Sequence, residues 1–275
     1  GVLLAAHERL EALLSTYTDF VESFDVVKGL GIDSTVDLDL EGISRLADGT
    51  FWVVAEGRGR GPAHAGAKGK GFRPNLLLHV AADGAILRAE LLPEVLVMAQ
   101  EGAGLEGVAA TEDHVYAILQ RPWGPANGLL RRTVLLRFEP ATGTWASAYY
   151  TLDVPASPAG GWVGVSGLQL LDSGLLAVLE RDNQGGTDAA VKRLYTVAPE
   201  DLAWSTSGDH DSIPVAGKTL LVDLIAERVF ADRAIPVPVF LEGLAVDSSG
   251  SLLLLNDNGG VPGNGGETHL VELVR

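Results

Sequence analysis

Acidic and amide side chains recur at matching positions in four similar segments of this sequence. Each segment starts with Glu-Gly or Ser-Gly, continues as an apolar strand, an Asp/Ser/Gly turn and a second apolar strand, and ends in polar residues. Because the second strand of a hairpin returns antiparallel to the first, the start and the end of each segment lie at the same edge. The starts are Glu41, Glu106, Ser166 and Glu242, and the ends are Glu56, Gln120, Glu180 with Asp182 and Asn183, and Asp257 with Asn258.

Such a gathering of carboxylates predicts a metal site. Neighbouring carboxylates repel one another, and their pKa values rise unless a cation neutralises them. Oxygen ligands without cysteine suit Ca²⁺, with Mg²⁺ and Mn²⁺ as alternatives. In the alternative interpretation, each Glu accepts hydrogen bonds from the backbone of the neighbouring segment and no metal is bound. The predicted ligands are Glu41, Glu242 and Asp257 as the preferred ones, with Glu106, Asp182 and Asn183.

Basic residues concentrate in the loops at 57–73, 120–133 and 181–193, which the hairpin geometry places over the same edge. These loops hold eleven of the 20 Lys and Arg residues of the chain. Cations above an acidic ring predict an anionic ligand such as a phosphate ester. For the glycine-rich loop 57–73, a flexible solvated tether is an equal alternative. The predicted substrate-binding residues are Arg58, Lys68, Lys70, Arg73, Arg121 and Arg181.

Two carboxylates, Glu56 and Glu180, are the candidate general bases, since each ends a strand at the predicted edge. The six histidines are scattered without the spacing of metal ligands, and no Gly-x-Ser-x-Gly motif is present. Trp123 and Trp162 are more typical of packing, although either is placed to flank a pocket.

The elements that position these residues form four-stranded units. Three of the four hairpins are followed by a second strand pair, at 76–92, 133–153 and 192–225. Tandem four-stranded antiparallel units predict the blades of a β-propeller, because one such sheet buries its faces only against its neighbours. Unrelated hairpins in a β-sandwich are the alternative. We thus expect an all-β propeller over 36–275 and, over 1–35, a short helix and a strand from 15–27 that closes the ring.

The composition limits the classes of ligand and partner that the protein is expected to bind. A net charge of −16 and a pI near 4.7 argue against nucleic acid or an anionic membrane as a ligand. The chain has no cysteine, and its apolar runs are far shorter than the roughly 20 residues that span a bilayer. The N-terminus is not an intact signal peptide, which leaves a removed signal open.

Taken in order, several stretches resemble a known family. They include DLEGISRLADGTFWVVAEG at 39–57, SPAGGWVGVSGLQLLDSGLLAVLERDNQGG at 157–186 and LEGLAVDSSGSLLLLNDNGG at 241–260. Together they resemble the phytase-like propellers described by an esterase-like activity of phytase. The resemblance implies a secreted or periplasmic protein, related in architecture to calcium-dependent phytases. Those have six blades where we count four, so another chain supplying blades is a further prediction, and Ser166 stands where the other repeats have Glu.

The resulting prediction is a Ca²⁺-dependent phosphoric ester hydrolase with a small anionic substrate. The nearest rival is a lactonase or gluconolactonase-like propeller hydrolase, whose metal site Glu41, Asn183 and Asp257 imitate. The other is a non-catalytic propeller with a structural ion whose top face binds a partner.

Overall fold

The structure is a computed structural model and describes residues 39–57, 75–93, 95–96, 103–123, 131–207, 209–258 and 267–273. Four antiparallel sheets make up this described part of the protein. Blade 1 is β1 (Asp39–Arg45), β2 (Phe51–Glu56), β3 (Leu76–Val80) and β4 (Ile86–Leu91). Blade 2 is β5 (Leu105–Ala110), β6 (Val115–Leu119), β7 (Arg132–Glu139) and β8 (Thr144–Thr151). Blade 3 is β9 (Val163–Leu170), β10 (Leu176–Asp182), β11 (Lys192–Val197) and β12 (Thr219–Asp223), and blade 4 is β13 (Phe240–Val246), β14 (Leu252–Asp257) and β15 (Leu270–Leu273). Short 3₁₀ turns at Gly186–Asp188, Pro199–Asp201, His210–Ser212 and Ala231–Arg233 complete the elements.

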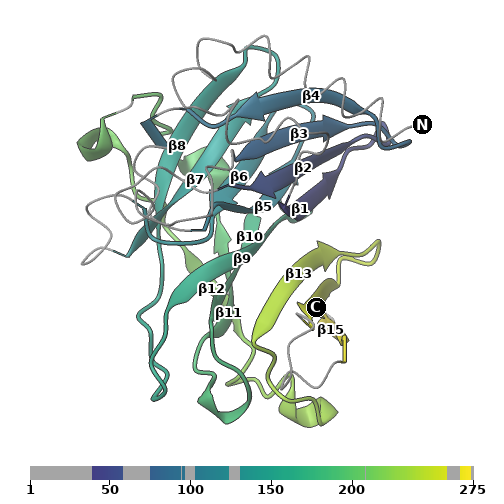
Figure 1. The fold of residues 1–275 in the computed structure, drawn as a ribbon, viewed down its shortest axis with the longest axis vertical. Helices are drawn as coiled ribbons and strands as arrows, with labels where there is room; N and C mark the ends of the chain where they lie inside the picture. The colour runs from purple at the N-terminus through teal and green to yellow at the C-terminus, as the bar shows by residue number, and fades with distance from the viewer. Residues whose placement is uncertain are drawn as a thin grey trace, which may run out of the picture.

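The blades follow one another around their first strands in a four-blade propeller arrangement (Figure 1). β1 packs against β5, β5 against β9, and β9 against β13. Alternating apolar residues of each blade fill the space toward the next, so one apolar core lies at each of the three blade junctions. A fourth, smaller cluster covers the opposite face of blade 1.

The repeated Glu-Gly pairs have a structural cause at these junctions. In three blades, the pairing of the first two strands shifts register at this pair, and in blade 3 it shifts at the equivalent Ser-Gly. A Cβ on Gly42 would come within 2.9 Å of the Val108 backbone nitrogen, and one on Gly107 within 2.7 Å of Leu168. Glycine therefore lets consecutive first strands approach closely, and the bulge redirects the preceding side chain.

The turns of the inner hairpins are fixed by their own side chains. Asp48 accepts a hydrogen bond from the backbone N–H of Thr50 at 2.9 Å, and Asp247 accepts one from Ser249 at 2.8 Å. The long connection between β11 and β12 instead crosses to blade 2. There it pairs with β8 through Ser205 opposite Ser147 and Val215 beside Tyr149.

The prediction of an all-β propeller with four visible blades is confirmed, and the sandwich alternative is wrong. The expected N-terminal helix and ring-closing strand fall in residues 1–38, outside the described residues, so the division at 35/36 stays a prediction. The expectation that another chain supplies blades also stays a prediction. Among the residues that the structure describes, no helix is long and apolar enough to cross a membrane.

Candidate metal and anion site

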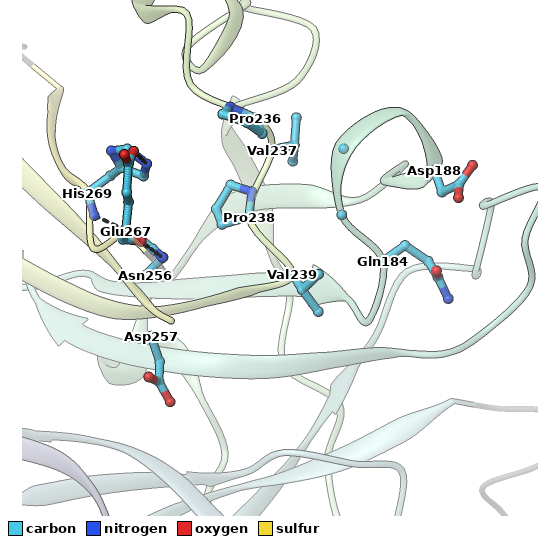
Figure 2. A pocket seen from close by; sticks show the side chains of 12 residues that line it. Gln184, Asp188, Pro236, Val237, Pro238, Val239, Asn256, Asp257, Glu267 and His269 are labelled. Carbon is cyan, nitrogen blue, oxygen red and sulfur yellow. Dashed lines mark hydrogen bonds and ion pairs between the residues drawn. The ribbon is translucent and has the colours of Figure 1, made fainter. Parts of the chain in front are cut away.

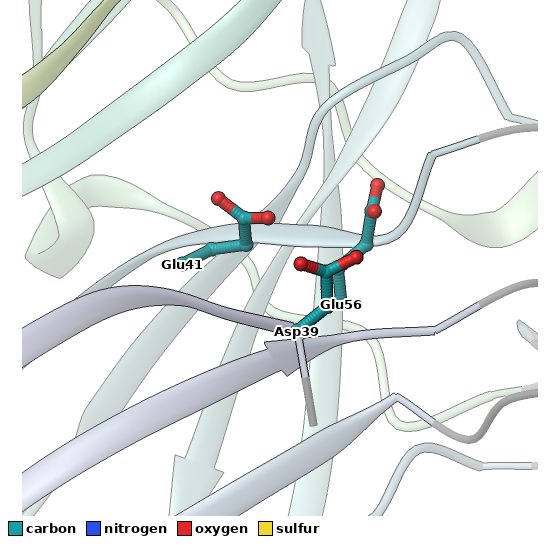
Figure 3. A group of neighbouring side chains, drawn as sticks. All are labelled: Asp39, Glu41 and Glu56. Atoms are coloured by element: carbon teal, nitrogen blue, oxygen red, sulfur yellow. The ribbon is translucent and has the colours of Figure 1, made fainter. Parts of the chain in front are cut away.

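Three carboxylates meet where β1 begins and β2 ends. Asp39, Glu41 and Glu56 each offer an oxygen that lies within 4.8 Å of the oxygens of the other two. Asp39 stands directly opposite Glu56 in the strand pairing, and Glu41 follows two residues after Asp39. Figure 3 shows the three side chains on the same side of the paired strands. We call Asp39, Glu41 and Glu56 the carboxylate triad.

The first strands of blades 2 and 4 bring further acidic residues near the triad. Burial and the charges of Glu56, Asp39, Glu242 and Asp257 raise the pKa of Glu41 to about 7. The same pattern of burial and acidic neighbours raises the pKa of a second glutamate even more. Burial, followed by the charges of Glu41, Glu56 and Glu242, raises the pKa of Glu106 to about 9, although Arg181 acts in the opposite direction. The starts of three blades therefore converge on one acidic centre.

Backbone and amide donors also contact this centre, as the interpretation without metal anticipated. Glu56 accepts a hydrogen bond from the Gly104 N–H at 3.0 Å, across the junction between blades 1 and 2. Glu106, which is buried, accepts one from the side-chain amide of Gln120. These bonds orient the carboxylates without using all the acceptor sites that a carboxylate has.

Two arginines lie together beside the acidic centre. The guanidinium of Arg121 stacks 3.9 Å from the ring centre of Trp162, and that of Arg181 lies 5.4 Å from the same ring. Arg181 also pairs with Glu242 at 2.6 Å, from a side chain that is only 3% exposed. Burial, and then the charge of Arg181, lowers the pKa of Arg121.

The arginine pair, Arg121 and Arg181, has guanidinium N–H groups without a hydrogen-bond acceptor among the described residues. Nε and Nη1 of Arg181 and Nε of Arg121 are buried, and none has a hydrogen-bond partner in the described part of the chain. Buried polar groups are nearly always paired, and an orphaned guanidinium N–H is costly. These three donors make the arginine pair a candidate anion site next to the carboxylates.

Other predicted ligands lie elsewhere in the fold. The Asp182 carboxylate pairs with Lys192 at 2.9 Å and accepts backbone N–H groups of Ala190 and Val191, at 2.6 and 2.9 Å. The amide oxygen of Asn183 accepts the Trp162 N–H at 2.9 Å. Asn183 thus holds Trp162, on whose ring the arginines stack. Because its oxygen accepts this bond, the structure does not favour Asn183 as a metal ligand of a lactonase-like site.

Glu180, one of the two candidate bases, lies in a closed network between blades 2 and 3. Its side chain has no exposed surface, and it accepts bonds from the Tyr150 hydroxyl at 2.6 Å, the Asp153 N–H at 2.9 Å and the Lys218 ammonium. Burial raises the pKa of Glu180, against the opposing effect of Lys218. The structure brings Glu56, and not Glu180, to the triad.

Several predicted residues cannot be compared with the geometry, and one contributor was missed. The predicted Arg58, Lys68, Lys70 and Arg73 lie outside the described residues. Ser166, at the position of Glu in the other blades, donates its hydroxyl to the Leu241 carbonyl oxygen at 2.6 Å and joins β9 to β13. Asp39 was not predicted, although residues two apart in a strand share a face and the pair Asp39 and Glu41 is visible in the sequence.

These features define a class of protein, a β-propeller with an acidic, cation-attracting centre and adjacent arginine donors. The family model described as phytase-like, with esterase-like activity of phytase, matches residues 18–260. The chain therefore belongs to this phytase-like family, and its fold and family indicate a phytase-like hydrolase. No curated protein matches the sequence.

Proposed function

We propose that this protein is a Ca²⁺-dependent hydrolase of phosphate esters. The observation that carries the proposal is the set of buried guanidinium N–H groups of Arg121 and Arg181 beside the acidic centre, which have no hydrogen-bond partner among the described residues. Arginine donors match the oxygens of a phosphoryl group, whereas the neighbouring carboxylates would repel that group unless a cation stood between them. The family match supports the same class of reaction.

The donor set of the triad suits a hard cation. Asp39, Glu41 and Glu56 supply only oxygens and lie close enough to share one ion. The pKa of Glu41 is raised by burial and by repulsion from neighbouring carboxylates, and a bound cation would reduce that repulsion. Ca²⁺ accepts six to eight oxygen ligands in flexible geometry, which the further carboxylates Glu106, Glu242 and Asp257 would help to supply. When bound, the ion would acidify a water molecule and polarise the phosphoryl oxygen.

The chain's own residues would perform the remaining tasks. Arg121 and Arg181 would hold the phosphoryl oxygens and stabilise the charge that develops on them. Glu56 is our candidate for accepting the proton of the attacking water, because it lies in the triad. In the reaction, the water oxygen bonds to phosphorus and the ester P–O bond breaks. The departing alkoxide takes up the proton that Glu56 removed from the water and leaves as the alcohol. The basic residues of 57–73 remain proposed contributors to phosphate binding.

The direct test measures hydrolysis of an aryl phosphate by protein freed of metal and then supplied with Ca²⁺, Mg²⁺ or Mn²⁺. We expect turnover to require the metal and to be highest with Ca²⁺. Substituting Glu41→Gln should weaken Ca²⁺ binding about tenfold or more, measured by calorimetry, because it removes a charged ligand. Turnover that is indifferent to chelation would contradict the metal part of the proposal.

The arginine part has its own matched pair of variants. Arg121→Met should lower kcat/KM for the aryl phosphate about 100-fold, as loss of one transition-state donor does, and leave Ca²⁺ affinity nearly unchanged. The control is Arg137→Met, because Arg137 also lies against a tryptophan, 5.1 Å from the ring centre of Trp204, but on the outer part of the molecule. Equal activities of the two variants would contradict the assignment of Arg121 and Arg181 to phosphate binding.

A Ca²⁺-dependent enzyme of this kind fits the periplasm or the outside of the cell. Modules that work there bind Ca²⁺ at roughly 10⁻⁴ to 10⁻³ M, an affinity that a partly exposed carboxylate site can reach. The measured Ca²⁺ dissociation constant tests this: a value far below the micromolar range would argue for another setting.

A further inference from the structure

A cavity of about 450 Å³ lies between blades 3 and 4, next to the acidic centre. It has the size of a small-molecule site. Figure 2 shows its walls: the 184–188 turn on one side, the 236–239 segment in the middle, and the end of β14 with Glu267 and His269 on the other. Asp257 belongs both to this cavity and to the carboxylates that raise the pKa of Glu41.

The walls of the cavity are held in place by the protein itself. The Gly186 N–H donates to the Val237 carbonyl oxygen at 2.8 Å. Behind them, the buried Lys192 ammonium donates to the carbonyl oxygens of Gln184 at 2.9 Å and Val239 at 3.4 Å. The opposite wall is tied by Asn256, which donates to the Glu267 carbonyl oxygen at 3.1 Å. The cavity is therefore a preformed site.

Its lining combines an apolar strip with negative charge. Pro236, Val237, Pro238 and Val239 form the apolar strip. Three carboxylates line the cavity, from Asp188, Asp257 and Glu267, and its described lining residues include no Lys or Arg. The nearby His269 ring lies 3.5 Å from the Glu267 carboxylate. Such a surface repels anions and suits a group that carries a positive charge on an aliphatic body.

The cavity adjoins the proposed phosphate position through blade 4. Asp257 pairs with Phe240 across β13 and β14, and the Arg181 guanidinium lies 5.4 Å from the Phe240 ring centre. The arginine pair does not line the cavity, but Phe240 and Asp257 connect the two, and the alcohol half of an ester held at the arginines would extend along this connection.

We infer that the cavity receives the alcohol half of the substrate and selects phosphate monoesters of cationic amino alcohols. The inference rests on the proposed function and narrows it: a polyphosphorylated substrate would place further anions against Asp188 and Glu267. A quaternary or primary ammonium group on a short chain meets both the apolar strip and the carboxylates.

The test compares phosphocholine with 3,3-dimethylbutyl phosphate, which has the same shape and lacks the charge. We expect kcat/KM for phosphocholine to be about tenfold higher, the effect of a few partly screened charge pairs. Inositol hexakisphosphate should be turned over more slowly than either. In parallel, NMR titration with choline and with 3,3-dimethylbutanol measures binding to the cavity without any reaction.

Matched variants separate cavity charge from overall charge. Asp188→Asn with Glu267→Gln keeps the shape of two exposed side chains, and the bonded backbone oxygen of Glu267 is untouched. This double variant should reduce the preference for phosphocholine to about threefold or less. The control, Glu112→Gln with Asp113→Asn, removes two exposed charges from a blade 2 turn and should keep the preference.

The outcomes distinguish this inference from the proposed function. If aryl phosphate is hydrolysed but phosphocholine and its neutral analogue are treated alike, the inference falls and the proposed function stands. If no phosphate ester is hydrolysed but choline binds in preference to 3,3-dimethylbutanol and the double variant abolishes that preference, the cavity is a cation site and the proposed function falls. If neither hydrolysis nor binding shows a preference for the charged compound, the inference is overturned.

Discussion

Two groups of carboxylates in this protein differ in what surrounds them. Among the described residues, the charges that act on Glu41 of the triad are those of other carboxylates, and together with burial they raise its pKa. Between blades 2 and 3, cations of the chain itself surround the acids, in a cluster that we call the junction network. It consists of Tyr150, Asp153, Glu180, Arg193, Tyr195, Lys218 and Asp223.

The junction network shows how the protein neutralises acids that serve the fold. Asp153 receives bonds from Arg193 and Tyr195, each at 2.6 Å, and from Lys218 at 2.9 Å. Although burial acts to raise it, these bonds lower the pKa of Asp153. Lys218 also lies over the Tyr195 ring, 3.9 Å from its centre. The acids that hold blades 2 and 3 together are thus neutralised by cations of the chain, whereas the carboxylates around Glu41 raise its pKa.

The pair of Asp182 and Lys192 gives the largest expected effect on stability. Both side chains are at most 1% exposed, and burial lowers the pKa of Lys192 to about 8. Lys192→Met removes the cation and leaves the carboxylate buried, which should lower the free energy of unfolding by about 3 to 5 kcal/mol. Urea unfolding measures the change.

The control for that substitution is an ion pair of similar chemistry at the surface. Arg228 and Asp232 pair at 3.0 Å with side chains that are 68% and 61% exposed. Arg228→Met should change the free energy of unfolding by less than about 0.5 kcal/mol. Similar losses in the two variants would mean that Lys192 does not act through burial of the pair.

The sequence predicts the blades well and the site in part, and the reason is the range of the interactions. Strand alternation, Gly-containing turns and the Glu-Gly repeats are local, so the four hairpins and the convergence of Glu41, Glu106 and Glu242 were predictable. The stacking of Arg121 and Arg181 on Trp162 joins blades 2 and 3, and no local pattern specifies it.

The residues that sequence reasoning placed elsewhere are those with distant partners. Glu180 and Asp182 have the same polar, strand-ending pattern as Glu56. Their partners are Lys218, 38 residues from Glu180, and Lys192, which lies across a turn from Asp182. A pattern of acids predicts where they gather, and only the fold shows which acids have a cation of the chain beside them.

Glu180→Gln should have an intermediate effect and separates a structural from a catalytic role. It removes the charge opposite Lys218 but keeps an oxygen for Tyr150, so we expect a loss of about 1 to 3 kcal/mol in the free energy of unfolding. The kcat/KM of the folded protein for an aryl phosphate should change less than about threefold, whereas loss of a general base costs about 100-fold or more. A decrease of about 100-fold in kcat/KM would show that Glu180 acts as a catalytic base.

The smallest expected effect concerns the pH dependence of the metal-free protein, and its sign distinguishes the two groups of acids. Since the pKa values of Glu41 and Glu106 are raised to about 7 and about 9, these two groups hold more protons in the folded chain than in the unfolded chain, from about pH 4.5 up to their folded pKa values. Stability should therefore fall as the pH rises through this window, by less than about 1.4 kcal/mol per pH unit for each group. For Asp153, whose pKa is lowered, stability is lost only as the pH falls below the usual range of an aspartate.

Saturating Ca²⁺ should abolish this decline, because a cation at the triad favours the charged carboxylates that the metal-free protein disfavours. The charged groups that face Glu41 and Glu106 are the carboxylates of Asp39, Glu56, Glu242 and Asp257 and the guanidinium of Arg181. Thermal unfolding at pH 5, 6, 7 and 8, with chelator and with Ca²⁺, measures both curves, and the stabilisation by Ca²⁺ should grow with pH. Glu41→Gln should reduce both the decline and the Ca²⁺ effect. If the stability of the chelated protein rises with pH, cations of the chain itself neutralise the triad, as they do in the junction network.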